Sequence, residues 1–297
     1  MLTRRRFAQA SVASLVAGST LGRGGLAGAE DDAFGSLSES FAKIEQESGG
    51  RLGVFVLDTK SGASAGHRAG ERFPMCSTFK LLAAAATLAN IDSGKEQLAR
   101  RIAVKPSDIL SYAPITKQHA GGEMSVGELC EAAITLSDNT AANLLVASLG
   151  GPQAVTQFAR SLGDEFTRLD RVEPDLNSGE PGDPRDTTLP SAMAKDLAKL
   201  ATGDALAAAS RDQLVDWLVA CKTGGAKLRA GLPKAWRVGD KTGSGGHGSS
   251  NDVAAIWPAG RPPIVIASYL TETAASDEKK NAAHAAVARA VAEALAS

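Results

Sequence analysis

Aromatic side chains are scarce in this sequence of 297 residues, where they make up 4%. Proteins that bind single-stranded nucleic acid stack bases on aromatic rings, so this scarcity argues against that class. A strong positive charge is also lacking, because lysine and arginine number 32 and aspartate and glutamate number 33. This balance argues against a nucleic-acid partner in general.

Cysteine and histidine are few as well. Three cysteines cannot all pair within one chain, and the four histidines are scattered without the spacing of metal ligands. The sequence therefore implies no metal and no other cofactor. Long apolar runs are absent too, since none approaches the roughly 20 residues of a membrane-spanning helix. We expect a soluble mature protein that does not associate with the membrane.

The first 29 residues have the composition of an export signal. Three arginines at positions 4–6 precede a short apolar run over 8–16, and Ala27-Gly28-Ala29 forms a small-x-small end. The paired arginines before Phe7 resemble a twin-arginine signal, and an ordinary arginine-rich secretory signal is the alternative. We expect cleavage after Ala29 and a periplasmic or secreted protein.

Removing this segment leaves 268 residues with 28 basic and 33 acidic side chains, a net charge of −5. That length suits one large domain or two interleaved ones, with a core that needs no disulfide or metal. We expect a monomer, the default when no feature indicates an assembly.

Hydrophobic periodicity predicts strands near both ends of the chain and helices between them. The predicted strands are 51–58, 63–68, 236–242, 252–257 and 263–270, and the predicted helices are 33–48, 78–91, 126–136, 140–149, 153–162, 191–200, 211–220 and 278–296. Strands from both ends usually join one sheet. We therefore expect an α/β lobe from residues 30–68 and 212–297 and an all-α lobe from 69–211. A proline-rich active-site loop over 168–186 belongs to the second lobe, and the cleft between the lobes is the default active site.

One serine and one lysine stand at the start of a predicted helix. Ser77 and Lys80 lie three positions apart and so share a helix face. A serine needs a base to become a nucleophile, and a buried lysine can serve as one. The free N–H groups of a helix N-terminus can stabilise an oxyanion.

Three further motifs carry polar groups. Ser137-Asp138-Asn139 lies between two predicted helices, where it also fits an ordinary helix cap. The tripeptide K-T-G occurs at Lys222 and again at Lys241. The first copy ends a predicted helix, whereas the second ends a strand-like run at a glycine-rich turn, where it can meet a ligand. Glu173 lies in the long loop, where an isolated glutamate is normally solvated.

Together, S-x-x-K, S-D-N, K-T-G and the loop glutamate form the recognised signature of class A serine β-lactamases, and this chain resembles that family. All four elements stand in the family's order over essentially the whole mature chain. The stretches RLDRVEPDLN and VGDKTGSGGHG are similar to the cefotaximase-like branch. The resemblance implies an α/β protein of the α+β type, with a two-lobed fold that β-lactamases share with DD-peptidases. An antiparallel five-stranded sheet is flanked by the terminal helices and joined to an all-α lobe.

The resemblance also implies the chemistry, which is hydrolysis of penicillins and cephalosporins and hence antibiotic resistance. Ser77 attacks the lactam carbonyl, and the N–H groups of Ser77 and Ser244 form the oxyanion hole. Lys80 or Glu173 acts as the acylation base, an alternative that stays open. Ser137 relays a proton to the lactam nitrogen, and Glu173 and Asn177 hold the deacylating water.

The same resemblance assigns the substrate contacts. Lys241, Thr242 and Ser244 receive the substrate carboxylate, Asn139 contacts the acyl amide and Tyr112 lines the cleft. Arg171 and Asp186 are expected to clasp the loop, and the Glu173–Pro174 bond is expected to be cis.

The sequence departs from some branches of the family. One branch pairs the positions that Ala84 and Cys130 occupy here, and carbapenemases pair those of Cys76 and Gly245, so neither disulfide can form. We expect three free thiols. Lys227 stands where one branch has an arginine that clamps the substrate carboxylate, and we expect Lys227 to bind that group.

Two other functions share part of this motif set. A penicillin-binding DD-peptidase lacks the water site of Glu173 and Asn177, and a β-lactam sensor normally needs a membrane-tethered partner domain.

Overall fold

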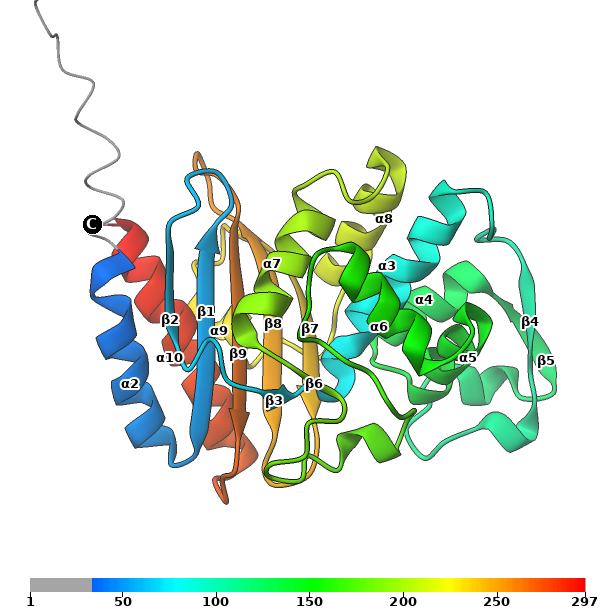
Figure 1. The fold of residues 1–297 in the computed structure, drawn as a ribbon, viewed down its shortest axis with the longest axis horizontal. Helices are drawn as coiled ribbons and strands as arrows, with labels where there is room; N and C mark the ends of the chain where they lie inside the picture. The colour runs from blue at the N-terminus through cyan, green and yellow to red at the C-terminus, as the bar shows by residue number, and fades with distance from the viewer. Residues whose placement is uncertain (1–33, 297) are drawn as a thin grey trace, which may run out of the picture.

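A five-stranded antiparallel sheet forms the centre of the protein, as a computed structural model describes it for residues 34–296 (Figure 1). Its strand order is β2-β1-β9-β8-β7, so the strands from the two ends of the chain lie side by side. The strands are β1 (Arg51–Asp58), β2 (Ser64–His67), β7 (Arg237–Ser244), β8 (Ser250–Trp257) and β9 (Ile264–Thr271). The predicted sheet is confirmed. The expected export signal at residues 1–29 lies outside the described residues.

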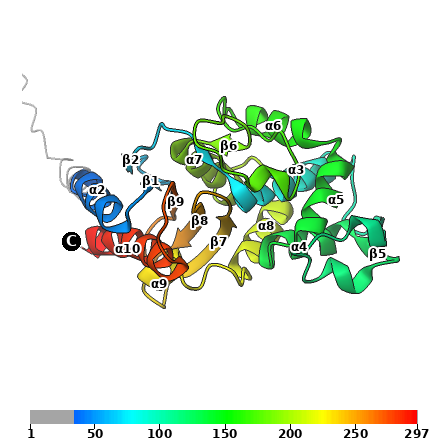
Figure 2. The same ribbon diagram turned by 90° about the horizontal axis from the view of Figure 1, so that it is seen from below.

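Two long helices cover one face of the sheet: α2 (Leu37–Ser48) and α10 (Asp277–Ala296) (Figure 2). Helix α2 presents Leu37, Phe41 and Ile44 on one side, the spacing that buries a single helix face. It ends at Gly49, whose φ of 68° is the left-handed conformation that glycine adopts at a helix C-terminus. These side chains form one hydrophobic core with the outward face of the sheet.

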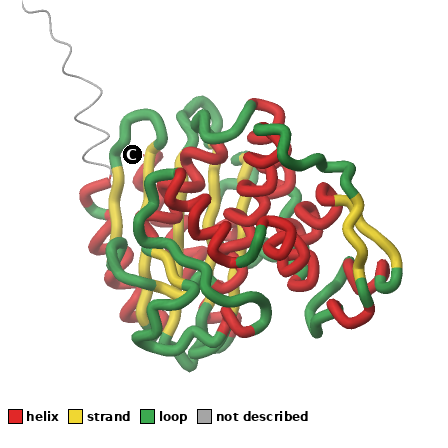
Figure 3. The backbone as a smooth tube through the Cα atoms, turned by 45° about the vertical axis from the view of Figure 1, so that its right-hand side comes forward, coloured by secondary structure: helices red, strands yellow, loops and turns green. Residues whose placement is uncertain are grey.

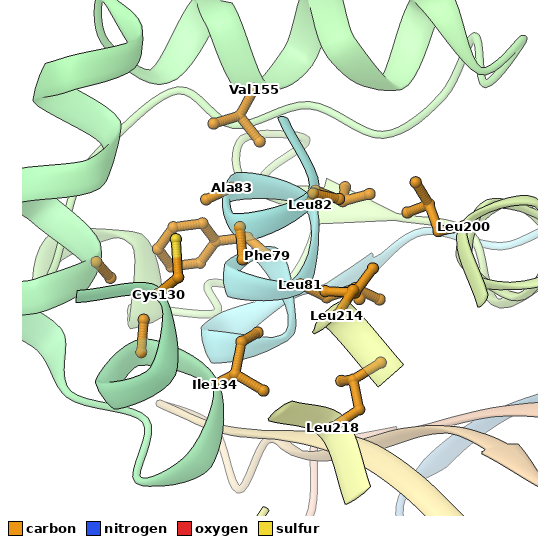
Figure 4. Packing of buried hydrophobic residues seen from close by; sticks show 14 of the residues in the cluster. Phe79, Leu81, Leu82, Ala83, Cys130, Ile134, Val155, Leu200, Leu214 and Leu218 are labelled. Atoms are coloured by element: carbon orange, nitrogen blue, oxygen red, sulfur yellow. The ribbon is translucent and has the colours of Figure 1, made fainter. Parts of the chain in front are cut away.

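A second, larger core surrounds helix α3 (Phe79–Asp92), whose residues 79–88 are all buried (Figure 4). Most of its residues are alanine or leucine, and the small alanines allow neighbouring helices to approach closely. The neighbours are α4 (Val126–Thr135), α5 (Asn139–Leu149), α6 (Pro152–Ser161), α7 (Pro190–Ala201) and α8 (Ala208–Val219). Helix α7 packs on β1 and β9, and α8 packs on β7, so this core also covers the inner face of the sheet.

The central part of the chain also contains short strands and a short helix that the helical periodicity does not reveal. Strands β4 (Arg101–Val104) and β5 (Gly122–Ser125) form a hairpin at the end of the molecule remote from the main sheet (Figures 1 and 3). Strands β3 (Phe73–Pro74) and β6 (Thr187–Thr188) form a two-residue ladder, and α9 (Leu228–Gly231) is a single turn. Only Val104 and Met124 of the hairpin are buried, so its apolar pattern is too weak to indicate strands.

No helix within residues 34–296 is long and apolar enough to span a bilayer.

Candidate active site

The turn that carries Ser77 is held in an unusual backbone conformation. Cys76 has a φ of 45°, a left-handed value that is costly for a residue with a side chain. Asn251 of β8 donates hydrogen bonds from Nδ2 to the carbonyls of Pro74 and Met75, at 2.9 and 3.0 Å. These bonds pin the chain before a 3-10 turn, Cys76–Thr78, which leads directly into α3. Ser77 therefore sits at the helix N-terminus, 9% exposed.

Ser77, Lys80 and Glu173 meet at one carboxylate oxygen. The Ser77 hydroxyl donates to Glu173 Oε1 at 3.2 Å, and Lys80 Nζ lies 2.9 Å from the same atom. The side chains of Lys80 and Glu173 have no exposed surface. Burial lowers the pKa of Lys80 to about 8, while the Glu173 carboxylate opposes the shift. The Ser77 hydroxyl thus contacts Glu173 directly, and Lys80 reaches it through the same carboxylate oxygen, so the choice between the two bases stays open.

The S-D-N motif forms another part of the site. Ser137 has a φ of 58°, and its hydroxyl accepts from Lys241 Nζ at 3.0 Å and from Lys80 Nζ at 3.4 Å. Asp138 caps α5 by accepting from the N–H of Ala141, so the ordinary cap role and a role in the site coexist. Asn139 Oδ1 accepts from Lys80 Nζ at 2.6 Å.

Glu173 is fixed from both sides of its backbone. Asn143 of α5 donates to the Glu173 carbonyl at 2.8 Å and accepts from the Glu173 N–H at 2.9 Å. The Glu173–Pro174 bond is cis, as expected. Asn177 donates from Nδ2 to Glu173 Oε2, and Asn177 Oδ1 is a buried acceptor without a protein partner. Sequence reasoning missed Asn143, although it lies one helical turn beyond Asn139.

The loop that carries Glu173 is clasped at its base. Arg171 Nε donates to Asp186 Oδ2 at 2.6 Å. Asp186 Oδ1 accepts from the backbone N–H groups of Asp170 and Arg171, at 2.7 and 2.9 Å. The side chain of Asp186 is 1% exposed, so the expected clasp exists and is desolvated on its acidic side.

Strand β7 lies against the nucleophile turn. Lys241 is fully buried and donates to Ser137 Oγ and to the carbonyl of Thr242, and burial lowers its pKa. A Cβ on Gly243 would lie 2.8 Å from the Met75 carbonyl oxygen, so only glycine allows this approach. The strand runs through Ser244, two residues beyond its predicted end.

A cavity of about 340 Å³ collects these side chains. It is lined by Ser77, Tyr112, Ser137, Asn139, Asn177, Thr223, Lys227, Thr242, Gly243 and Ser244. Lys80, Glu173 and Lys241 lie behind this lining, in contact with it. Tyr112 is 49% exposed and accepts the Asn139 N–H on its carbonyl. A larger cavity of about 430 Å³, under residues 179–185 of the loop, contains none of the predicted catalytic groups.

The first K-T-G copy also reaches this cavity. Lys222 is exposed, but the hydroxyls of Thr223 and Thr242 lie 2.6 Å apart. Sequence reasoning assigned the first copy to a helix end and missed Thr223.

Lys227 lines the cavity from the turn before α9. It is 8% exposed and donates from Nζ to Ser250 Oγ on β8. Burial lowers its pKa, and the Asp252 carboxyl opposes this shift.

All three cysteines are free, as predicted, and the structure buries them. Burial raises the pKa of Cys76 to about 12, so this residue stays a thiol beside the nucleophile. Within residues 34–296 no group of three or more acidic, histidine or cysteine side chains is arranged to hold a metal ion.

A buried lysine and glutamate behind a serine that lines a polar cavity form an arrangement typical of hydrolases with a serine nucleophile. Comparison with known proteins gives the particular family. A family model described as "Beta-lactamase enzyme family" matches residues 36–295. Beta-lactamase L2 of Stenotrophomonas maltophilia is 50% identical over 296 residues, which cover 97% of this chain and 98% of that protein. Beta-lactamase Toho-1 of Escherichia coli is 51% identical over 256 residues, 86% and 88% of the two chains.

Comparison with solved structures gives the same family. An ancestral class A β-lactamase, reconstructed for Gram-negative bacteria, superimposes with a TM-score of 0.86 at 62% identity, covering 87% of this chain and 99% of that one. A putative class A β-lactamase from Rhodopseudomonas palustris has the same TM-score at 56% identity, covering 87% and 99%. The chain belongs to the class A β-lactamases, which are hydrolases of the β-lactam amide bond.

Proposed function

We propose that this enzyme hydrolyses penicillins and cephalosporins through an acyl-enzyme on Ser77 and thereby confers antibiotic resistance. The observation that carries the proposal is the contact of Ser77 Oγ and Lys80 Nζ with one oxygen of Glu173, beside the cavity. A serine becomes a nucleophile when an adjacent base takes its proton, and this contact places a carboxylate at the Ser77 hydroxyl.

In acylation the Ser77 oxygen attacks the lactam carbonyl as its proton passes to Glu173 or to Lys80. The N–H groups of Ser77 and Ser244 stabilise the oxyanion that forms. The lactam C–N bond then breaks as Ser137 delivers its hydroxyl proton to the nitrogen and takes one from Lys80, so the proton that left Ser77 ends on the product nitrogen and Glu173 is again a base. The hydrogen bonds that Ser137 accepts from Lys80 and Lys241 support this relay.

In deacylation Glu173 takes a proton from a water molecule that attacks the acyl ester, and Ser77 leaves with a proton. Asn177 holds that water with Glu173. The unpartnered Asn177 Oδ1 supports this role, because a buried acceptor needs a donor.

The rest of the cavity binds the substrate. Lys241, Thr242, Ser244 and Lys227 receive its carboxylate, Asn139 contacts the acyl amide, and Tyr112 forms the outer wall. The polar lining of the cavity on the β7 side supports this assignment.

The proposal also covers the oligomeric state, the partners, the two lobes and the export of the enzyme. The chain works as a monomer without a cofactor, a nucleic acid or a membrane partner. Residues 30–68 with 212–297 form one lobe and residues 69–211 the other. The enzyme is exported to the periplasm or secreted by a twin-arginine signal that is cleaved after Ala29.

The alternative functions, a penicillin-binding DD-peptidase or a β-lactam-acylated sensor, both deacylate slowly after reaction with a β-lactam. The Glu173–Asn177 contact favours hydrolysis over both. The test mixes pure protein with a chromogenic cephalosporin and follows product release and intact mass. Many turnovers per molecule support the proposal, and a single stoichiometric burst with a stable adduct overturns it.

A further inference from the structure

A chain of hydrogen bonds runs from the cavity to helix α10 on the far side of the sheet. Lys227 Nζ donates to Ser250 Oγ, which lies 3.1 Å from His284 Nε2. On the other side of the ring, His284 Nδ1 lies 2.8 Å from Ser268 Oγ of β9. All four residues are buried, and His284 and Ser268 are 0% exposed. A polar chain at this depth must satisfy its own donors and acceptors.

The His284 ring, which forms the middle of this series of hydrogen bonds, is neutral. Burial, reinforced by the positive charge of Lys227, lowers the pKa of His284 well below 6.5. A neutral imidazole has one donor nitrogen and one acceptor nitrogen. If Nδ1 donates to Ser268, then Nε2 accepts the Ser250 hydroxyl proton, and the Ser250 oxygen presents its lone pairs to Lys227. The opposite tautomer donates from Nε2 to the Ser250 carbonyl, 3.1 Å away, and leaves the hydroxyl proton without this acceptor.

Other charges compete for the Lys227 ammonium. Asp252 attracts it from β8, and the Asp252 Oδ2 atom already accepts the N–H of Leu228 at 3.0 Å. From α10, Lys280 repels it, although Lys280 pairs with Asp277 at 2.7 Å. Within the described residues, the Ser250 bond is the one hydrogen bond of Lys227 Nζ, so two N–H groups stay available to the cavity.

We infer that His284 is a positioning residue for substrates that carry a carboxylate beside the lactam nitrogen. It orients the Ser250 hydroxyl, and the Ser250 oxygen holds the Lys227 ammonium at the cavity rather than at Asp252. His284 thus acts on substrate selection without touching the substrate. The inference rests on the proposed function, because Lys227 must bind the carboxylate.

The test compares a penicillin with its methyl ester, which keeps the lactam but has no carboxylate. His284→Ala raises KM for the acid about 5-fold, leaves kcat within 2-fold, and leaves both constants for the ester unchanged. Lys227→Ala gives the same pattern with a KM increase of at least about 10-fold. His284→Asn, which keeps a donor and an acceptor, recovers part of the loss.

Val287→Ala is the matched control, because Val287 is fully buried one helical turn from His284. We expect it to change acid and ester equally. If His284→Ala does not fold, Ser250→Ala breaks the same chain with a smaller loss of volume. Equal effects of His284→Ala on acid and ester, or an acid-specific loss in Val287→Ala, overturn the inference.

The outcomes also separate the inference from the proposed function. If Lys227→Ala shows the acid-specific loss and neither His284→Ala nor Ser250→Ala does, the positioning role alone is wrong. If Lys227→Ala leaves KM unchanged for several β-lactams, the role of Lys227 in carboxylate binding is wrong. If the parent enzyme turns over neither substrate, the proposed hydrolysis itself fails.

Discussion

Two buried pairs of ionisable side chains in this enzyme differ in charge, because one joins opposite charges and the other joins two acids. In the cleft, Lys80 and Glu173 are an ammonium and a carboxylate 2.9 Å apart. Between α6 and α7, Asp164 and Asp196 are two carboxyl groups, 5% and 1% exposed, each with an Oδ2 atom that has no other partner. Burial raises the pKa of Asp196 to about 9, and the charge of Asp164 adds to that shift. Asp196 therefore keeps its proton at neutral pH, and a hydrogen bond with Asp164 that uses this proton joins the pair.

We expect the first pair to affect turnover and the second pair to affect the free energy of unfolding. The lysine and glutamate border a cavity where a proton can pass to a substrate, so changing either one alters turnover. The two aspartates only anchor the start of the loop, because Asp164 Oδ1 accepts the N–H groups of Phe166 and Thr167, at 2.7 and 3.0 Å. Changing the proton between them alters stability and leaves turnover intact.

The largest effect is expected for Glu173→Gln. The amide keeps the volume but cannot take a proton from water, so kcat falls by about 10³-fold. Intact mass spectrometry then detects an accumulated acyl adduct on Ser77. Turnover at the parent rate would show that Glu173 has no role in the reaction. It would contradict the assignment of catalysis to the Lys80–Glu173 pair.

The two K-T-G copies provide the next test. Lys241→Ala removes the buried donor to Ser137, and kcat/KM falls by about 10²-fold. Lys222→Ala changes the same residue type in the same tripeptide, but Lys222 is exposed, so activity stays within about 2-fold. Steady-state kinetics of the two variants measure this difference. Equal losses of kcat/KM would contradict the assignment of the second K-T-G copy to the active site.

Asp186→Asn weakens the clasp that joins the two ends of the loop that carries Glu173. We expect the free energy of unfolding to fall by about 2 kcal/mol, because a desolvated partner of Arg171 is lost while the arginine stays partly solvated. Deacylation slows as Glu173 and Asn177 lose their fixed geometry. Denaturant unfolding and single-turnover kinetics measure the two effects.

Glu180→Gln is the control for the clasp, since Glu180 lies on the same loop and pairs with the exposed His247 rather than with Arg171. It should leave both measurements nearly unchanged. A loss as large as that of Asp186→Asn would mean that the whole loop, rather than the clasp, determines stability.

The smallest effect concerns pH and stability. Because the pKa of Asp196 is raised on folding, its stabilising contribution is complete below about pH 4 and is lost as pH rises toward about 9. Asp196→Asn mimics the protonated acid at every pH, so its stability relative to the parent increases from pH 5 to pH 8. Thermal unfolding at pH 5 and pH 8 measures this difference.

The exposed Asp212→Asn serves as its control and should show no such dependence on pH. Unchanged kcat in Asp196→Asn supports the separation of the two pairs. A parallel stability curve for parent and Asp196→Asn would contradict the hydrogen bond that uses the Asp196 proton.

Local patterns predicted the elements that bury a continuous apolar face. Helix α3 and strands β1, β8 and β9 appear within two residues of their predicted ends, because propensity and burial agree there. The hairpin β4–β5 was missed, because exposed polar strands leave little periodic signal.

The amino-acid sequence alone determined which chemical groups are present and in what order, because motifs of three or four residues specify their own local turns. That was enough to identify the family and the absence of both family disulfides and to propose Ser77 as the nucleophile. The tertiary structure decided which groups touch. Ser77 and Glu173 are 96 positions apart, and Ser137 and Lys241 are 104 apart. Asn143, Thr223 and the chain from Lys227 to His284 acquire their partners only when the helices pack on the sheet. Contacts over such separations depend on the packing of the whole core, which no short pattern encodes.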